Sequence, residues 1–91
     1  MDKVAKRIIF KGRVQGVGFR YTTQRAANRY DLAGLVRNLP DGSVEAFLQG
    51  TSPNIQACLD DLKDAFGGYL REINMTDQPI NSRHHDFRIT Y

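Results

Sequence analysis

Three stretches of the chain alternate apolar and polar residues, the pattern of strands that bury one face. They are residues 7–13, residues 43–49 and residues 86–91. Shorter apolar runs predict two further strands, at residues 35–39 and 70–75. In the last of the alternating stretches, the side chains predicted to point inward are Phe87, Ile89 and Tyr91.

Two other stretches repeat every three to four residues, as helices with one buried face do. The first runs from about Thr22 to Tyr30 and has a narrow stripe of small side chains. Ser52 is predicted to cap the second, with Pro53 at its first position, and Gly67-Gly68 to end it. Its predicted buried stripe is Ile55, Leu59, Leu62 and Phe66.

The predicted elements follow the order β-α-β-β-α-β with one closing strand. Pro40-Asp41-Gly42 is a strong turn signal, so residues 35–39 and 43–49 are expected to pair as a hairpin. This order predicts an α+β, ferredoxin-like split β-α-β fold: an antiparallel sheet with two helices on one face. Right-handed crossovers would place residues 7–13 and 43–49 side by side at the centre of the sheet.

A glycine-rich loop follows the first predicted strand and precedes the first helix. Gly12, Gly16 and Gly18 free its backbone to curl, and Arg20 adds a planar two-pronged donor. Backbone amides and a helix N-terminus both favour negative charge, so the segment reads as a phosphate cradle. Taken alone, the same pattern could be a tight connection that binds nothing.

Length, composition and charge restrict the class of protein. The 91 residues suit one domain, with 41% apolar and 25% charged residues. A net charge of +3 suits an anionic partner but is too small to indicate nucleic acid. We find no secretion signal and no apolar run of the roughly 20 residues that would cross a membrane. With one cysteine, Cys58, no internal disulfide can form, which fits a reducing compartment. Together these features lead us to expect a cytoplasmic protein that binds neither membrane nor nucleic acid.

Two motifs carry a resemblance to a known family. The sequence GRVQGVGFRY at residues 12–21, followed by VRNLPDGSVE at residues 36–45, closely resembles the acylphosphatases, and DFRITY at residues 86–91 resembles their closing strand. The resemblance covers essentially the whole chain. It implies a single acylphosphatase-like domain over residues 1–91, expected to be a monomer. It also implies hydrolysis of the carboxyl-phosphate anhydride of small-molecule acyl phosphates by water attack on phosphorus, without metal, cofactor or covalent intermediate.

The resemblance also assigns roles to residues of this chain. It implies that Arg20 holds the phosphate and that Asn38 orients the attacking water. Backbone amides of the loop would complete the phosphate-binding site, at Gln15, Gly16, Val17, Gly18, Phe19 and Arg20. Asp31 stands where glycine is frequent in the family, and we expect it to adopt a left-handed conformation at modest cost.

Two alternatives belong to other classes. One is a non-catalytic anion-binding or RNA-binding ferredoxin-like module, with Phe47 on the outward face of the sheet as a stacking platform for bases. The other is a regulatory or carbamoyl-phosphate-handling module of a larger protein, against which we count the end of the chain soon after the last strand.

Three further residues invite special roles. His84 and His85 are adjacent, and neighbouring strand residues face opposite ways, so they are expected to be solvated and not to chelate one metal ion. Cys58 is expected to be a half-buried packing residue of the second helix.

Overall fold

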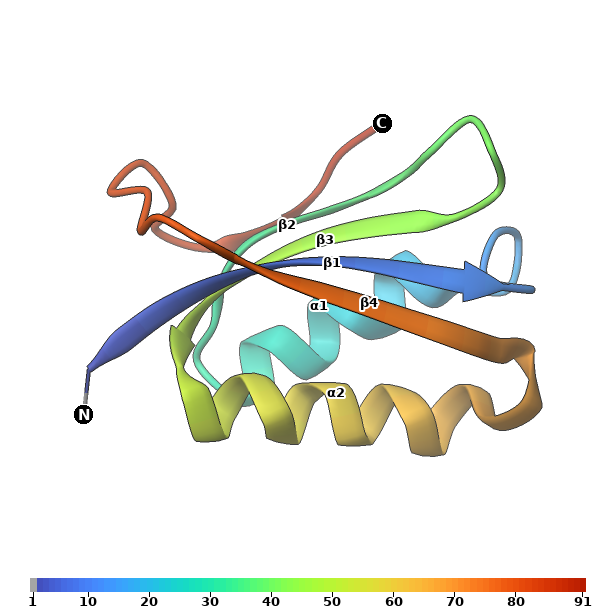
Figure 1. The fold of residues 1–91 in the computed structure, drawn as a ribbon, viewed down its shortest axis with the longest axis horizontal. Coiled ribbons are helices and arrows are strands. Elements are labelled where there is room, and N and C mark those ends of the chain that lie inside the picture. Colours follow the sequence, from blue (N-terminus) through green and yellow to red (C-terminus); the bar gives the residue numbers. More distant parts are fainter. Residues whose placement is uncertain (1) are drawn as a thin grey trace.

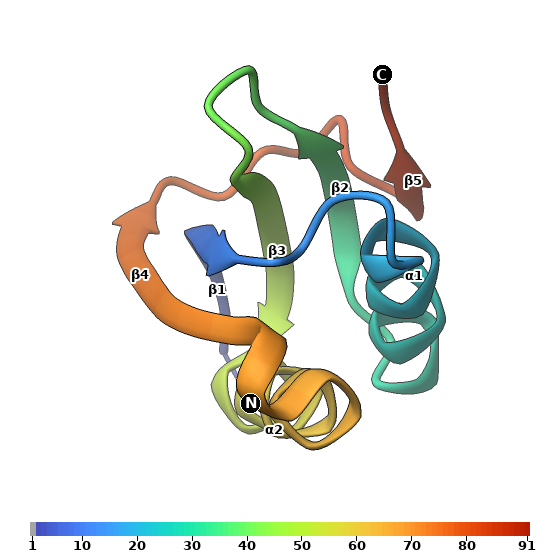
Figure 2. The ribbon, with the colours of Figure 1, turned by 90° about the vertical axis from the view of Figure 1, so that its right-hand side faces the viewer.

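The computed structural model describes residues 2–91, in which a five-stranded sheet is covered on one face by two helices (Figures 1 and 2). In chain order the elements are β1 (Lys3–Gly12), α1 (Phe19–Arg29), β2 (Ala33–Asn38), β3 (Val44–Thr51), α2 (Ser52–Phe66), a short 3-10 helix (Gly67–Tyr69), β4 (Leu70–Gln78) and β5 (Phe87–Ile89). The predicted order β-α-β-β-α-β with a closing strand is therefore confirmed.

The strands lie in the order β4-β1-β3-β2-β5, so β1 and β3 occupy the centre of the sheet as predicted. β2 and β3 form the predicted hairpin, with Val36 opposite Ala46. All neighbouring strands are antiparallel except β5, which pairs parallel with β2 and makes the sheet mixed. The parallel pair brings residues 87–89 beside β2, close to the end of β2 that carries Asn38.

The core lies between the sheet and the helices, and strand alternation decides which side chains enter it. Ile8 and Phe10 of β1 are fully buried, as are Val44, Ala46 and Leu48 of β3. Three aromatic rings continue this core to the start of α1, where the Phe19 ring lies 4.9 Å from that of Phe10 and 4.7 Å from that of Phe66. Burial of Phe19 therefore fixes the first residue of α1, and with it the neighbouring Arg20.

Several predicted boundaries were wrong by a few residues. Helix α1 begins at Phe19 and not near Thr22, because Gly18 takes the left-handed N-cap conformation with a φ of 78°. Helix α2 is capped by Thr51 and not by Ser52: the Thr51 hydroxyl accepts a hydrogen bond from the Asn54 amide. The capping oxygen thus comes from the last residue of β3, one position before the residue that the pattern predicted. A pattern in the sequence does not fix the end of a helix to within one residue.

The predictions for the remaining special residues had mixed outcomes. Asp31 has a φ of 57°, which confirms its left-handed conformation. Cys58 is fully buried, not half-buried, and burial raises the pKa of its thiol to about 12. Tyr91 does not point inward: its side chain is 99% exposed, because β5 ends at Ile89 and the alternation of the strand no longer applies.

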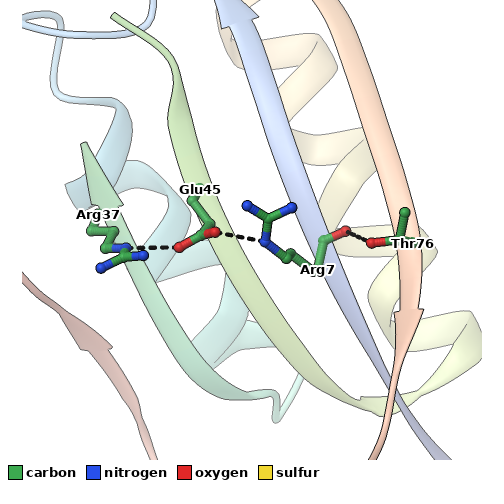
Figure 3. A network of polar contacts seen from close by, with 4 residues as sticks. All are labelled: Arg7, Arg37, Glu45 and Thr76. Carbon is green, nitrogen blue, oxygen red and sulfur yellow. Dashed lines mark hydrogen bonds and ion pairs between the residues drawn. The ribbon is translucent and has the colours of Figure 1, made fainter. Parts of the chain in front are cut away.

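On the face of the sheet away from the helices, one carboxylate joins two arginines (Figure 3). Glu45 lies 2.6 Å from Arg7 Nε through one oxygen and 2.7 Å from Arg37 Nε through the other. Arg37 is exposed and forms one of these two ion pairs. Burial raises the pKa of Glu45, but the hydrogen bonds from Arg37 and Arg7 outweigh that effect and lower it below the ordinary 4.5.

Replacing Glu45 by glutamine is expected to lower the free energy of unfolding at pH 7 by about 1–3 kcal/mol, because two charge-assisted hydrogen bonds are weakened. A lowered folded-state pKa stabilises the fold above the unfolded pKa of the group, and that stabilisation is lost as the pH falls through the lowered value. Urea unfolding should thus show a gap between the free energies of unfolding of the two proteins at pH 7, and this gap should close well below pH 4.5. Glu72→Gln, at an exposed glutamate of β4, is the matched control. A gap that persists in acid would contradict this account.

Candidate active site

The loop between β1 and α1 is anchored at both ends by buried side chains. Val14 and Phe19 are each 1% exposed. Between them Gly16 and Gly18 have φ values of 77° and 78°, a region that side chains with a Cβ rarely adopt. Nothing lies within 4 Å of a Cβ added at either glycine, so the backbone conformation and not a lack of space requires glycine here. The loop therefore delivers its backbone, in a fixed curl, to the N-terminus of α1.

The side chain of Gln15 ties this loop to the β2–β3 hairpin. Its Nε2 donates hydrogen bonds to the carbonyl oxygens of Leu39, at 2.8 Å, and Ser43, at 2.9 Å. The hairpin turn is itself closed by Asp41, whose carboxylate accepts from the Ser43 amide and hydroxyl. Gln15 thereby connects the glycine loop with the segment that follows Asn38.

Arg20 is the second residue of α1 and is half-buried. Its Nη1 lies 3.5 Å from the Thr90 carbonyl oxygen, a long and weak contact, and its guanidinium carbon lies 4.8 Å from the centre of the Tyr91 ring. No carboxylate of residues 2–91 forms an ion pair with it. The guanidinium thus keeps its charge and most of its donors for a ligand.

Asn38 is the last residue of β2, and its side-chain carbonyl oxygen is buried. No donor among the described residues hydrogen-bonds to this Oδ1 atom. Buried acceptors in proteins nearly always have partners, so an unpaired one calls for an explanation. A ligand or water hydrogen-bonded to Asn38 is the simplest explanation that the surroundings offer.

Arg20, Asn38 and the glycine loop line one cavity of about 250 Å³. Its lining residues are Val14, Gly16, Gly18, Phe19, Arg20, Tyr21, Asn38, Ile89 and Tyr91. Arg20 and Asn38, which are 18 residues apart in the sequence, thus line the same cavity. Gln15 and Val17 belong to the loop but do not line the cavity: Gln15 faces the hairpin and Val17 is exposed.

Four residues of this cavity were not predicted as site residues: Val14, Tyr21, Ile89 and Tyr91. Tyr91 was expected in the core, and Tyr21 belongs to the first motif but received no role. The sequence signal for Tyr21 was its position directly after Arg20. No feature of the sequence indicated Tyr91 as a cavity residue, because its position depends on where β5 ends.

The histidines lie away from this cavity. The His84 ring packs at 4.9 Å from that of Phe47, and His85 is exposed. Among residues 2–91, no group of three or more histidine, cysteine, aspartate or glutamate side chains is arranged to hold a metal ion. No helix in that range is long and apolar enough to cross a membrane.

Removing the Gln15 side chain is expected to loosen the loop. Gln15→Ala should raise the dissociation constant of inorganic phosphate about tenfold, because the binding groups are no longer held in position. The free energy of unfolding should fall by only about 1–2 kcal/mol. Gln24→Ala is the matched control, since Gln24 makes a similar bond to the Phe87 carbonyl outside the cavity. Equal dissociation constants of inorganic phosphate for the wild type and Gln15→Ala would refute the tethering role.

The fold and the cavity define a class: a ferredoxin-like α+β protein with a glycine loop and an arginine at a helix N-terminus, an arrangement suited to a small anion. The family model for acylphosphatases matches residues 6–89. The chain therefore belongs to the acylphosphatase family, as its two motifs suggested.

Comparisons with individual relatives are consistent with this family assignment. An acylphosphatase of Nitrobacter hamburgensis is 44% identical over 80 residues, covering 88% of this chain and 80% of that protein. The crystal structure of acylphosphatase from Bacillus subtilis superposes with a TM-score of 0.88 at 38% identity, covering 97% of this chain and 99% of the other. HypF of T. kodakarensis gives a TM-score of 0.84 at 29% identity, but this chain covers only 12% of it. The fold thus also occurs as a small part of a longer protein.

Proposed function

We propose that this chain is an enzyme that hydrolyses acyl phosphates to a carboxylate and inorganic phosphate, by attack of water on phosphorus. One observation carries the proposal: in a member of the acylphosphatase family, one small cavity is lined by a guanidinium and a buried amide group at the start of a helix and the end of a strand, and within residues 2–91 the guanidinium has no ion-pair partner and the amide oxygen no hydrogen-bond donor. The substrate is a small molecule, and the protein acts as a cytoplasmic monomer that binds neither nucleic acid nor membranes.

In this proposal Arg20 and the loop hold the phosphoryl group. The guanidinium donates two parallel hydrogen bonds to two phosphate oxygens, and backbone amides of residues 15–20 donate to the others. Phosphoryl transfer demands mainly positioning and neutralisation of charge on these oxygens. A guanidinium and a ring of amides supply both, so the reaction as proposed needs no metal ion.

Asn38 positions the nucleophile. Its unpaired Oδ1 accepts a hydrogen bond from a water molecule, whose oxygen is then directed at phosphorus. As the water oxygen bonds to phosphorus, the bond from phosphorus to the acyl oxygen breaks. The leaving group departs as a carboxylate, a weak base that needs no protonation, and the proton of the water passes to a phosphate oxygen. No general base is required.

Hydrolysis in water enriched in oxygen-18 tests where the water attacks. Attack on phosphorus places the label in inorganic phosphate, and the released carboxylate stays unlabelled. Label in the carboxylate would mean attack on the carbonyl carbon and would overturn the proposed mechanism. The same reaction run with excess EDTA should proceed at an unchanged rate.

The alternative of an RNA-binding module is not favoured. Its stacking platform would be Phe47, but the His84 ring already packs against that side chain. Gln49 fixes the segment that carries His84, because its amide both donates to and accepts from the backbone of Asn81. Bases could stack on Phe47 only after this segment moved away.

A further inference from the structure

Exposed apolar side chains gather around the mouth of the cavity. Large apolar side chains of residues 2–91 are exposed at six positions: Val17, Tyr21, Tyr69, Met75, Ile80 and Tyr91. Tyr21 and Tyr91 line the cavity that contains Arg20 and Asn38, and Val17 lies between two glycines that line it. Two of the six exposed apolar side chains thus line one small site, although nothing in the hydrolysis of the anhydride itself uses them.

The geometry of the reaction predicts where the acyl group lies relative to these side chains. In an in-line displacement the attacking and leaving oxygens lie on opposite sides of phosphorus. The water partner, Asn38 Oδ1, is buried, whereas the side chains of Tyr21 and Tyr91 are 59% and 99% exposed. With the water at the closed end, the acyl group points to the open end, where the two tyrosine rings lie.

We propose that Tyr21 and Tyr91 form the binding surface for the acyl group, so that the enzyme selects acyl phosphates with an aromatic or other large apolar acyl group over acetyl phosphate. This inference rests on the proposed function. It adds a substrate class that neither the two motifs nor the phosphate-binding residues specify, since every acyl phosphate presents the same phosphoryl group to Arg20.

An arginine lies beside each of the two rings. The Arg20 guanidinium lies over the Tyr91 ring at 4.8 Å, and the Arg25 guanidinium lies 5.9 Å from the centre of the Tyr21 ring. Stacking between two aromatic rings adds to the burial of apolar area, and an acetyl group can provide neither to the same degree.

The test compares two substrates, benzoyl phosphate and acetyl phosphate, in the wild type, Tyr21→Ala and Tyr91→Ala. For each variant we expect kcat/KM to fall about 5- to 10-fold with benzoyl phosphate and less than about 2-fold with acetyl phosphate. Tyr91→Phe should behave like the wild type, because it keeps the ring. Tyr69→Ala is the matched control: Tyr69 is also exposed and also lies against an arginine, Arg13 at 5.9 Å, but it does not line the cavity.

The possible outcomes distinguish a failure of this inference from a failure of the proposed function. An equal loss with both substrates would mean that Tyr91 acts only by positioning Arg20, and it would overturn the inference for that residue. Unchanged selectivity in both alanine variants would overturn it altogether, while turnover of acetyl phosphate by the same samples would leave the proposed function intact. If the folded wild type hydrolysed neither substrate, the proposed function and the inference would both be wrong.

Discussion

Arg20→Ala is expected to abolish turnover of acyl phosphates and binding of inorganic phosphate together. Loss of a single preorganised donor commonly lowers kcat by about 10²–10³-fold, and an arginine that makes two charge-assisted contacts should exceed that. The fold should survive, because the side chain makes only one long hydrogen bond, at 3.5 Å, and one contact with an exposed ring. Steady-state kinetics and competitive inhibition by phosphate measure the two effects separately.

Two variants sharpen this prediction. Arg13→Ala removes an exposed arginine that flanks the loop and lies against Tyr69, so it should leave both activity and phosphate inhibition nearly unchanged. Arg20→Lys keeps the charge but not the two-pronged geometry, and it should recover only a small part of the lost rate. An Arg20→Ala protein with substantial turnover would show that phosphate binding depends on the loop alone.

Asn38→Ala is expected to reduce kcat by at least about 10²-fold while inorganic phosphate still binds, because only the site of the attacking water is lost. The free energy of unfolding should stay the same or rise, since the variant removes a buried acceptor without a protein partner. Activity should thus fall without any loss of stability, a combination that damage to the fold cannot produce.

Asn28→Ala, at an exposed position of α1, is the matched control and should retain full activity. Phosphate inhibition and urea unfolding are measured on the same preparations as kcat. If Asn38→Ala kept most of its turnover, the water-positioning role would be wrong. A parallel loss of phosphate binding would instead assign Asn38 to the phosphate.

The order of elements and the place of the sheet centre could be predicted because both depend on patterns that repeat along the chain. Alternation at Ile8 and Phe10 identifies a strand with one buried face wherever its exact ends lie. Chain topology then leaves few arrangements, and the central position of β1 and β3 follows. The ends of elements depend on single contacts, such as the hydroxyl of Thr51 and the left-handed Gly18, which periodicity does not reveal.

The candidate site likewise contains residues that the sequence predicts and contacts that it does not predict. Arg20 and Asn38 lie in sequence motifs, so they could be named from the sequence, and the fold brings them to one cavity. The tether from Gln15 to the Leu39 and Ser43 carbonyls could not be predicted, because it joins backbone atoms 24 and 28 residues away. The place of Tyr91 over Arg20 depends on the end of β5, which the alternating pattern overestimated.

Hydrolysis of benzoyl phosphate by the purified wild-type protein, in excess EDTA, tests the central claim most directly. We expect turnover far above the spontaneous rate, unaffected by the chelator and lost in both Arg20→Ala and Asn38→Ala. A folded wild-type protein that does not hydrolyse benzoyl phosphate, or one whose activity EDTA removes, would contradict it.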